Sequence, residues 1–176
     1  MKSKLFLIFI LVAISASIFG LSWQVELAIS DGTITRNLIW GVDPIATEGY
    51  NAGIDENYPI LPPSGLYAYF ALNDPACPYI TMLTKDIRKD EIVNHNWRAT
   101  CGGTFGSVYI SWNPLTIPNG IANIGVGSAI EPPTDWQNMS NTNLLSVSTG
   151  QYIWISFIPE ASGENTPPYL ISTKPM

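Results

Sequence analysis

Alternating apolar and polar residues predict β-strands along most of the chain after residue 20. In LSWQVELAI, residues 21–29, apolar side chains such as Trp23 and Val25 alternate with polar ones, which is the period of a strand with one buried face. Asp31-Gly32 follows, and a second alternating segment covers residues 33–42. Because Asp-Gly favours a tight hairpin turn, the pattern predicts an antiparallel hairpin here.

More segments have the composition and length of strands. Residues 66–72 (LYAYFAL) are apolar on both faces, which predicts a central position in a sheet. The CGGTFG turn predicts a second hairpin between its flanking segments, and Thr149-Gly150 predicts a turn between the last two strands. Residues 85–94 are short and charged, and fit one helical turn or a loop. The remaining predicted strands are 79–83, 97–101, 107–112, 121–127, 143–148 and 151–158.

The chain has no apolar spacing of three and four that persists over three helical turns, and no internal repeat. Its mature part is rich in Gly, Pro, Trp and Tyr, as secreted β-proteins are. The pattern therefore predicts an all-β fold of about eight or nine strands in an antiparallel β-sandwich of jelly-roll or immunoglobulin-like layout. We expect residues 21–176 to form one domain.

The first twenty residues have the features of a secretory signal peptide. Lys2 and Lys4 precede the apolar run 5–14, and small residues such as Ser17 and Gly20 follow it. A membrane anchor is the alternative, but the apolar run is shorter than the roughly twenty residues that span a bilayer. We expect residues 1–20 to be removed, and the mature protein to be extracellular or on the cell surface without a membrane segment.

Net charge and cysteine content indicate which partners and which covalent links the protein can have. The net charge is −6 with only eight Lys and Arg, which argues against a nucleic-acid partner. In an oxidising compartment the two cysteines, Cys77 and Cys101, most simply form one disulfide. Two free thiols or a metal pair are the alternatives, although neither CxxC spacing nor several histidines accompany the cysteines.

Signs of catalysis are weak. The one histidine, His95, lies in the polar segment DEIVNHNW and is expected on the surface, and no GxSxG motif is present to supply a nucleophile. A single histidine also falls short of a catalytic zinc site. Two converging carboxylates could still hydrolyse a glycoside, although no pair is indicated by spacing. We therefore expect no enzyme, with a secreted hydrolase as the alternative.

The segment GVDPIATEGYNAGIDENYPILPP, residues 41–63, combines four carboxylates with prolines and glycines. Hard oxygen ligands in a glycine-containing loop suit calcium, which is abundant outside cells. The segment lacks the pattern of an EF-hand, and the alternative is a loop of turns whose acidic side chains face water. The candidate calcium ligands are Asp43, Glu48, Asp55 and Glu56.

Aromatic residues offer a second possible kind of site, because a flat ring with one polar edge matches a sugar face. Trp40, Trp97, Trp112 and Trp154 lie in predicted strands and are expected in the core. Residues in predicted loops are the candidates for carbohydrate binding, namely Trp136, Tyr50 and Tyr58. Separately, Asp86 and Arg88 in KDIR predict a buried ion pair, because Arg offers a two-pronged donor to a carboxylate.

A series of motifs resembles a known family. WGVDPIATEGYNAGIDENYPILPPSGLYAYF is followed in order by KDIR, NWRAT, SWNPLTIP, DWQNMS and QYIWISF. This series resembles a repeated β-sandwich module of large secreted bacterial surface proteins, in which GxDPxATDG, an acidic Gly-Ile-Asp, a proline run, Asp-Ile-Arg and Trp-Asp-Pro recur. The resemblance implies a β-sandwich displayed outside the cell, with no activity attached to it. Glu48 and Asn113 depart from the Asp of that pattern, and the second change weakens a metal role for its loop.

The sequence thus predicts a secreted or cell-surface module with a structural or adhesive role, stabilised by calcium if the acidic loop binds it. One alternative is a carbohydrate-binding module. Another is a filament or matrix subunit that assembles by strand exchange through the segment 21–29. The expected partners are surface polysaccharide, other surface proteins or further copies of the chain.

Overall fold

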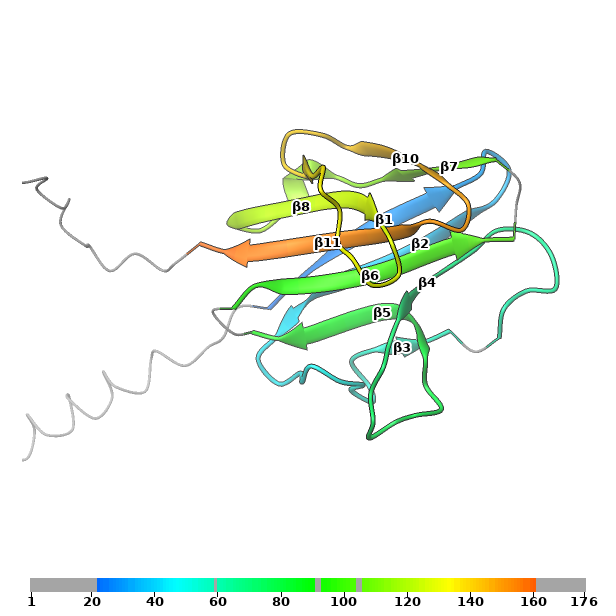
Figure 1. The fold of residues 1–176 in the computed structure, drawn as a ribbon. Helices are drawn as coiled ribbons and strands as arrows, with labels where there is room; N and C mark the ends of the chain where they lie inside the picture. The colour runs from blue at the N-terminus through cyan, green and yellow to red at the C-terminus, as the bar shows by residue number, and fades with distance from the viewer. Residues whose placement is uncertain (1–21, 59, 91–92, 104–105, 161–176) are drawn as a thin grey trace, which may run out of the picture.

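A computed structural model describes residues 22–58, 60–90, 93–103 and 106–160, so the predicted signal peptide lies outside the described residues. These residues form eleven strands and one short 3-10 helix, η1 (Pro114–Thr116) (Figure 1). The strands are β1 (Trp23–Ser30), β2 (Thr35–Asp43), β3 (Glu56–Asn57), β4 (Tyr67–Ala71), β5 (Met82–Lys89), β6 (His95–Gly102), β7 (Ser107–Ser111), β8 (Gly120–Gly127), β9 (Gln137–Asn138), β10 (Leu144–Ser148) and β11 (Tyr152–Pro159). The predicted all-β fold is confirmed. No described segment is a helix long and apolar enough to cross a membrane.

The strands belong to one mixed sheet in the order β10-β7-β1-β2-β5-β4-β6-β11-β8-β9, with β3 paired to β5. The sheet curls strongly into a half-barrel (Figure 1). Four strands separate β1 from β11 in this order, yet the rings of Trp23 and Phe157 lie 4.7 Å apart, so the two arms of the sheet face each other across the core. The sheet is continuous and β2 runs parallel to β5, so the strands are not all antiparallel as predicted.

The first hairpin forms as predicted. β1 and β2 pair antiparallel along eight residues, from Trp23 opposite Val42 to Ser30 opposite Thr35. Asp31 Oδ1 accepts hydrogen bonds from the backbone N–H of Thr33 at 2.9 Å and of Ile34 at 2.8 Å. Gly32 adopts a positive φ of 88°, which a residue without a Cβ tolerates.

The second predicted hairpin, around CGGTFG, is wrong. β6 pairs with β4 and β11, whereas β7 pairs with β1 and β10, so the segment after Cys101 carries the chain from one arm of the sheet to the other. Thr149-Gly150 forms the predicted turn between β10 and β11, although β10 pairs with β7, and β11 with β6 and β8. Alternation shows which side chains face the core but leaves the partner strand open. The central position of residues 66–72 is confirmed, because β4 lies between β5 and β6.

β5 covers residues that the sequence indicated as a helical turn or loop. The consecutive side chains Asp86 and Ile87 are both buried, so both faces of the strand are covered. The register also shifts between Glu56 and Asn57 on its neighbour β3. These two features remove the regular alternation by which a strand is found in sequence.

The core lines the inner surface of the curled sheet. Trp40 and Trp97 are fully buried, with ring centroids 4.9 Å apart, and Trp112 is 6% exposed, as predicted. Trp154 is the exception, because it lies on the outer face, partly exposed, and its indole N–H donates to the carbonyl of Ser128 at 2.9 Å.

Both cysteines are free in the structure, so the predicted disulfide is absent. Cys101 faces the core from β6 opposite Ala68, whereas Cys77 lies in the loop that begins after β4 ends at Ala71. Ala68 and Ala71 are about 10 Å apart along a strand. The cysteines therefore belong to different ends of β4, while a disulfide requires Cα atoms within about 7 Å.

We expect iodoacetamide to label Cys77 in the folded protein and to leave Cys101 unmodified until the protein unfolds. Cys77 is partly exposed, whereas burial raises the pKa of the Cys101 thiol to about 11, so little reactive thiolate forms at neutral pH. Mass spectrometry of the digested protein measures both sites. A protein that takes up no label before reduction would contradict this result and indicate the disulfide.

Candidate functional site

The acidic loop between β2 and β3 is fastened to β5 by Asp55, which is 6% exposed. Its Oδ1 accepts a hydrogen bond from the backbone N–H of Ile87 at 2.7 Å. Its Oδ2 accepts from the backbone N–H of Asn51 at 2.7 Å and from the Asn51 side-chain amide at 3.2 Å. Burial raises the pKa of Asp55, and these N–H donors offset part of that effect.

Asn51 organises the loop itself. Its Oδ1 accepts hydrogen bonds from the backbone N–H and the hydroxyl of Thr47, both at 2.9 Å. Its Nδ2 donates to the carbonyl of Gly49 at 2.8 Å. Since Asn51 is 8% exposed and also bonds Asp55, the segment from Thr47 to Asp55 forms one hydrogen-bonded unit.

The predicted Asp86–Arg88 pair is confirmed. Arg88 donates through Nε and Nη2 to the two oxygens of Asp86 at 3.4 and 3.2 Å, and its guanidinium lies 5.1 Å from the centre of the Trp97 ring. Glu48 Oε2 approaches Arg88 Nη1 at 3.8 Å. We call Glu48, Asn51, Asp55, Asp86 and Arg88 the polar clamp, because together they join the loop to β5.

His95 is buried rather than on the surface, with 2% exposure, so that prediction is wrong. Its ring packs 5.6 Å from the Trp97 ring, and its Nδ1 lies 3.6 Å from Glu48 Oε1. The loop residue Glu48 thus covers the start of β6, which local sequence polarity does not reveal. The other imidazole nitrogen, Nε2, is buried without a hydrogen-bond partner.

The four candidate calcium ligands do not converge. Asp55 is occupied by N–H donors, Glu48 faces Arg88 and His95, and Glu56 is exposed on β3. Asp43 accepts from the N–H of Ile45 at 3.0 Å and from the hydroxyl of Ser22 at 3.1 Å. Within the part of the chain that the structure describes, no group of three or more His, Cys, Asp or Glu residues could hold a metal.

We expect the thermal midpoint of the mature protein to be the same with calcium and with a chelator. A ligand that binds only the folded state raises the midpoint, and the carboxylates of Asp43 and Asp55 already accept hydrogen bonds from within the chain. Differential scanning calorimetry with and without calcium measures this. A midpoint several degrees higher with calcium, abolished by Asp43→Asn, would contradict this expectation and support the calcium prediction.

Among the described residues, the three candidate sugar-binding aromatics make no ring contact with one another. Tyr50 packs against the core, and its backbone N–H donates to Asp74 at 2.8 Å. Trp136 is partly exposed in the segment between β8 and β9. Tyr58 alone joins other aromatic residues, with its ring 6.2 Å from that of Tyr69 on β4.

A tyrosine cluster that sequence analysis missed lies on the outer face of the sheet. Tyr67 and Tyr69 project from β4, and Tyr152 from β11, with Thr100 of β6 directly between Tyr69 and Tyr152. All three tyrosines are partly exposed. Burial raises the pKa of Tyr69, and the nearby phenols of Tyr67 and Tyr152 raise it further. We call Tyr58, Tyr67, Tyr69 and Tyr152 the tyrosine face.

The segment 128–136, here named the strap, borders the tyrosine face. Arg98 donates to the carbonyl of Ala129, while Trp154 donates to Ser128. The Arg98 guanidinium lies 5.6 Å from the centre of the Tyr152 ring and 6.0 Å from that of Trp154. In Figure 1 the strap crosses in front of β11 towards β6.

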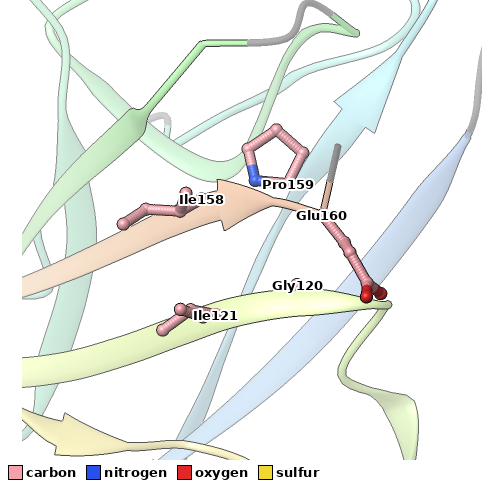
Figure 2. Close-up of a pocket in the computed structure, with 5 residues that line it drawn as sticks. All are labelled: Gly120, Ile121, Ile158, Pro159 and Glu160. Carbon is pink, nitrogen blue, oxygen red and sulfur yellow. The ribbon is translucent and has the colours of Figure 1, made fainter. Parts of the chain in front are cut away.

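A small apolar hollow of about 300 Å³ lies at the end of β11 and the start of β8. Figure 2 shows Ile121 and Ile158 side by side on these two strands, with Pro159 and Glu160 beyond them. The two isoleucines are paired in the sheet and are 49% and 38% exposed. None of the predicted site residues lines this hollow.

No protein family, curated protein or solved structure matches the chain. The resemblance to the module of secreted bacterial surface proteins therefore stays a prediction.

Proposed function

We propose that this protein is a secreted or cell-surface module with a structural or adhesive role and no catalytic activity. The polar clamp carries this proposal, because the residues that could have done chemistry are used to hold the long loop against β5. Asp55 and Asp86 are 6% and 3% exposed, and both accept hydrogen bonds from within the chain. A rigid loop supports a scaffold for display, whereas a hydrolase needs carboxylates that a substrate can reach.

Location and layout belong to the same proposal. The signal-like segment 1–20 supports export, and β1 supports a self-contained module, since it pairs with β2 and β7 of its own chain. Strand exchange, in which β1 inserts into the sheet of a neighbouring molecule, would break these pairs. A jelly-roll or immunoglobulin-like layout and a single domain over residues 21–176 are part of this proposal.

Protease treatment of intact cells that produce the protein tests its location, with immunoblotting as the readout. We expect the protein in the medium, or on cells in a form that external protease destroys while a cytoplasmic marker survives. Labelled mature protein should also adhere to the surface of these cells. Protein that resists protease until the cells are lysed, or that fails to adhere, would contradict the proposal.

A further inference from the structure

The outer surface of β4, β6 and β11 has an unusual composition for this acidic chain. The chain carries 14 acidic and 8 basic residues, yet the outward side chains of the three strands include no carboxylate. Apart from Ala71 and Ile158 at the strand ends, they are aromatic, hydroxyl or amide side chains with one arginine, namely Tyr67, Tyr69, Asn96, Arg98, Thr100, Tyr152, Trp154 and Ser156. The surface therefore offers flat rings and uncharged hydrogen-bonding groups.

Tyr67 lies across β6 rather than pointing away from the sheet. Its cross-strand partner is Gly102, and a Cβ added to Gly102 would come within 2.5 Å of the Tyr67 hydroxyl oxygen. A ring that projected perpendicular to the sheet would hold this oxygen far from Gly102. The Tyr67 ring therefore lies along the surface of the sheet, in the space that a Cβ at Gly102 would occupy. The ring plane of Tyr69 is inclined by only 20° to that of Tyr67, and the centroids of these two rings are 6.1 Å apart.

The guanidinium group of Arg98 is engaged by neighbouring groups of the same surface. The guanidinium donates to the Ala129 carbonyl of the strap and lies over the rings of Tyr152 and Trp154. Its Nε is buried without a hydrogen-bond partner. Arg98 therefore fixes the strap and the adjoining rings, and offers little free charge to an anionic ligand.

We propose that the tyrosine face binds a neutral polysaccharide chain, with sugar rings stacked on Tyr67 and Tyr69. The apolar face of a pyranose packs on an aromatic ring, and its hydroxyls find partners among phenol, Thr100 and Asn96 side chains. An acidic polysaccharide is disfavoured by the net charge of −6 and by the engagement of Arg98. This inference rests on the proposed function, since it names the partner of an adhesive module.

Affinity electrophoresis of the mature protein tests this binding, with gels containing a soluble β-glucan or galactomannan and a parallel gel containing alginate. We expect a neutral polysaccharide to retard the wild type and alginate to leave it unaffected. Tyr67→Ala combined with Tyr69→Ala should weaken the retardation at least about tenfold. Tyr109→Ala is the matched control, because Tyr109 is 50% exposed on β7 and should retain full binding.

A second variant keeps every tyrosine and changes only the ring position. Gly102→Ala places a methyl group against the Tyr67 hydroxyl and should lift the ring from the sheet. We expect weaker retardation at an unchanged tyrosine content, with circular dichroism showing that the variant is folded. Retardation of both this variant and the double variant equal to that of the wild type would overturn the proposal.

The outcomes separate this inference from the proposed function. If the wild type adheres to the producing cells but no neutral polysaccharide retards it, or alginate alone does, the inference is wrong and the adhesive role stands. If the protein neither adheres to the cells nor binds any polysaccharide, both fail.

Discussion

Replacing Asp55 by alanine is expected to lower the free energy of unfolding by about 3 kcal/mol. The change leaves the backbone N–H groups of Ile87 and Asn51 without their acceptor in a buried site, and such unsatisfied donors cost about 1–3 kcal/mol each. The loop would also lose its attachment to β5. Urea denaturation followed by tryptophan fluorescence measures the change.

Glu56→Ala is the matched control for Asp55, because it removes a carboxylate one residue away that is exposed on β3. Exposed substitutions of this kind usually change stability by less than about 0.5 kcal/mol. Equal effects of the two substitutions would show that the buried hydrogen bonds of Asp55 do not hold the loop.

The contribution of Asp55 should also depend on pH in a defined direction. Its pKa is raised in the folded protein, mainly because burial disfavours the charged form. As the pH falls through this raised pKa, the folded protein binds a proton that the unfolded chain still lacks, so stability rises. The gain is complete below the ordinary pKa of aspartate and is lost again as the pH rises. Asp55→Asn should remove this dependence, measured from about pH 7 to about pH 3.

Features that depend on neighbouring residues could be predicted from sequence. The Asp31-Gly32 hairpin needs only a turn and two alternating strands, and it is present. The Asp86–Arg88 pair spans two positions on one strand, where adjacent side chains on the same face meet. Burial of Trp40 and Trp97 also follows from their places in alternating segments.

Features that depend on which strands become neighbours could not be predicted. The tyrosine face combines residues of β4, β11 and the segment after β3, with β6 between β4 and β11, and the Tyr67 ring lies across β6 because Gly102 is its cross-strand partner. His95 is buried by Glu48 from a distant loop. In each case the sequence of a segment shows which of its side chains alternate, but it does not show which distant segment packs against them.

Trp97→Ala is expected to cost about 4 kcal/mol of unfolding free energy. The side chain is fully buried between Trp40 and Trp23, with ring centroids 4.9 and 6.4 Å away, and the change would leave a cavity where the two arms of the sheet meet. Its indole N–H also donates to the carbonyl of Asp86 at 3.1 Å. Calorimetry or urea denaturation measures the loss.

Two further variants separate the contributions of Trp97. Trp97→Phe keeps an aromatic ring but removes the hydrogen bond to Asp86, so it should cost less than the alanine variant. Trp154→Ala removes the same side chain from the partly exposed outer face and should cost less than Trp97→Ala, because less apolar area leaves a packed environment. An equal loss of stability in Trp154→Ala and Trp97→Ala would contradict this expectation. It would mean that the contact of Trp154 with the strap stabilises the fold as much as the contact between the two arms of the sheet.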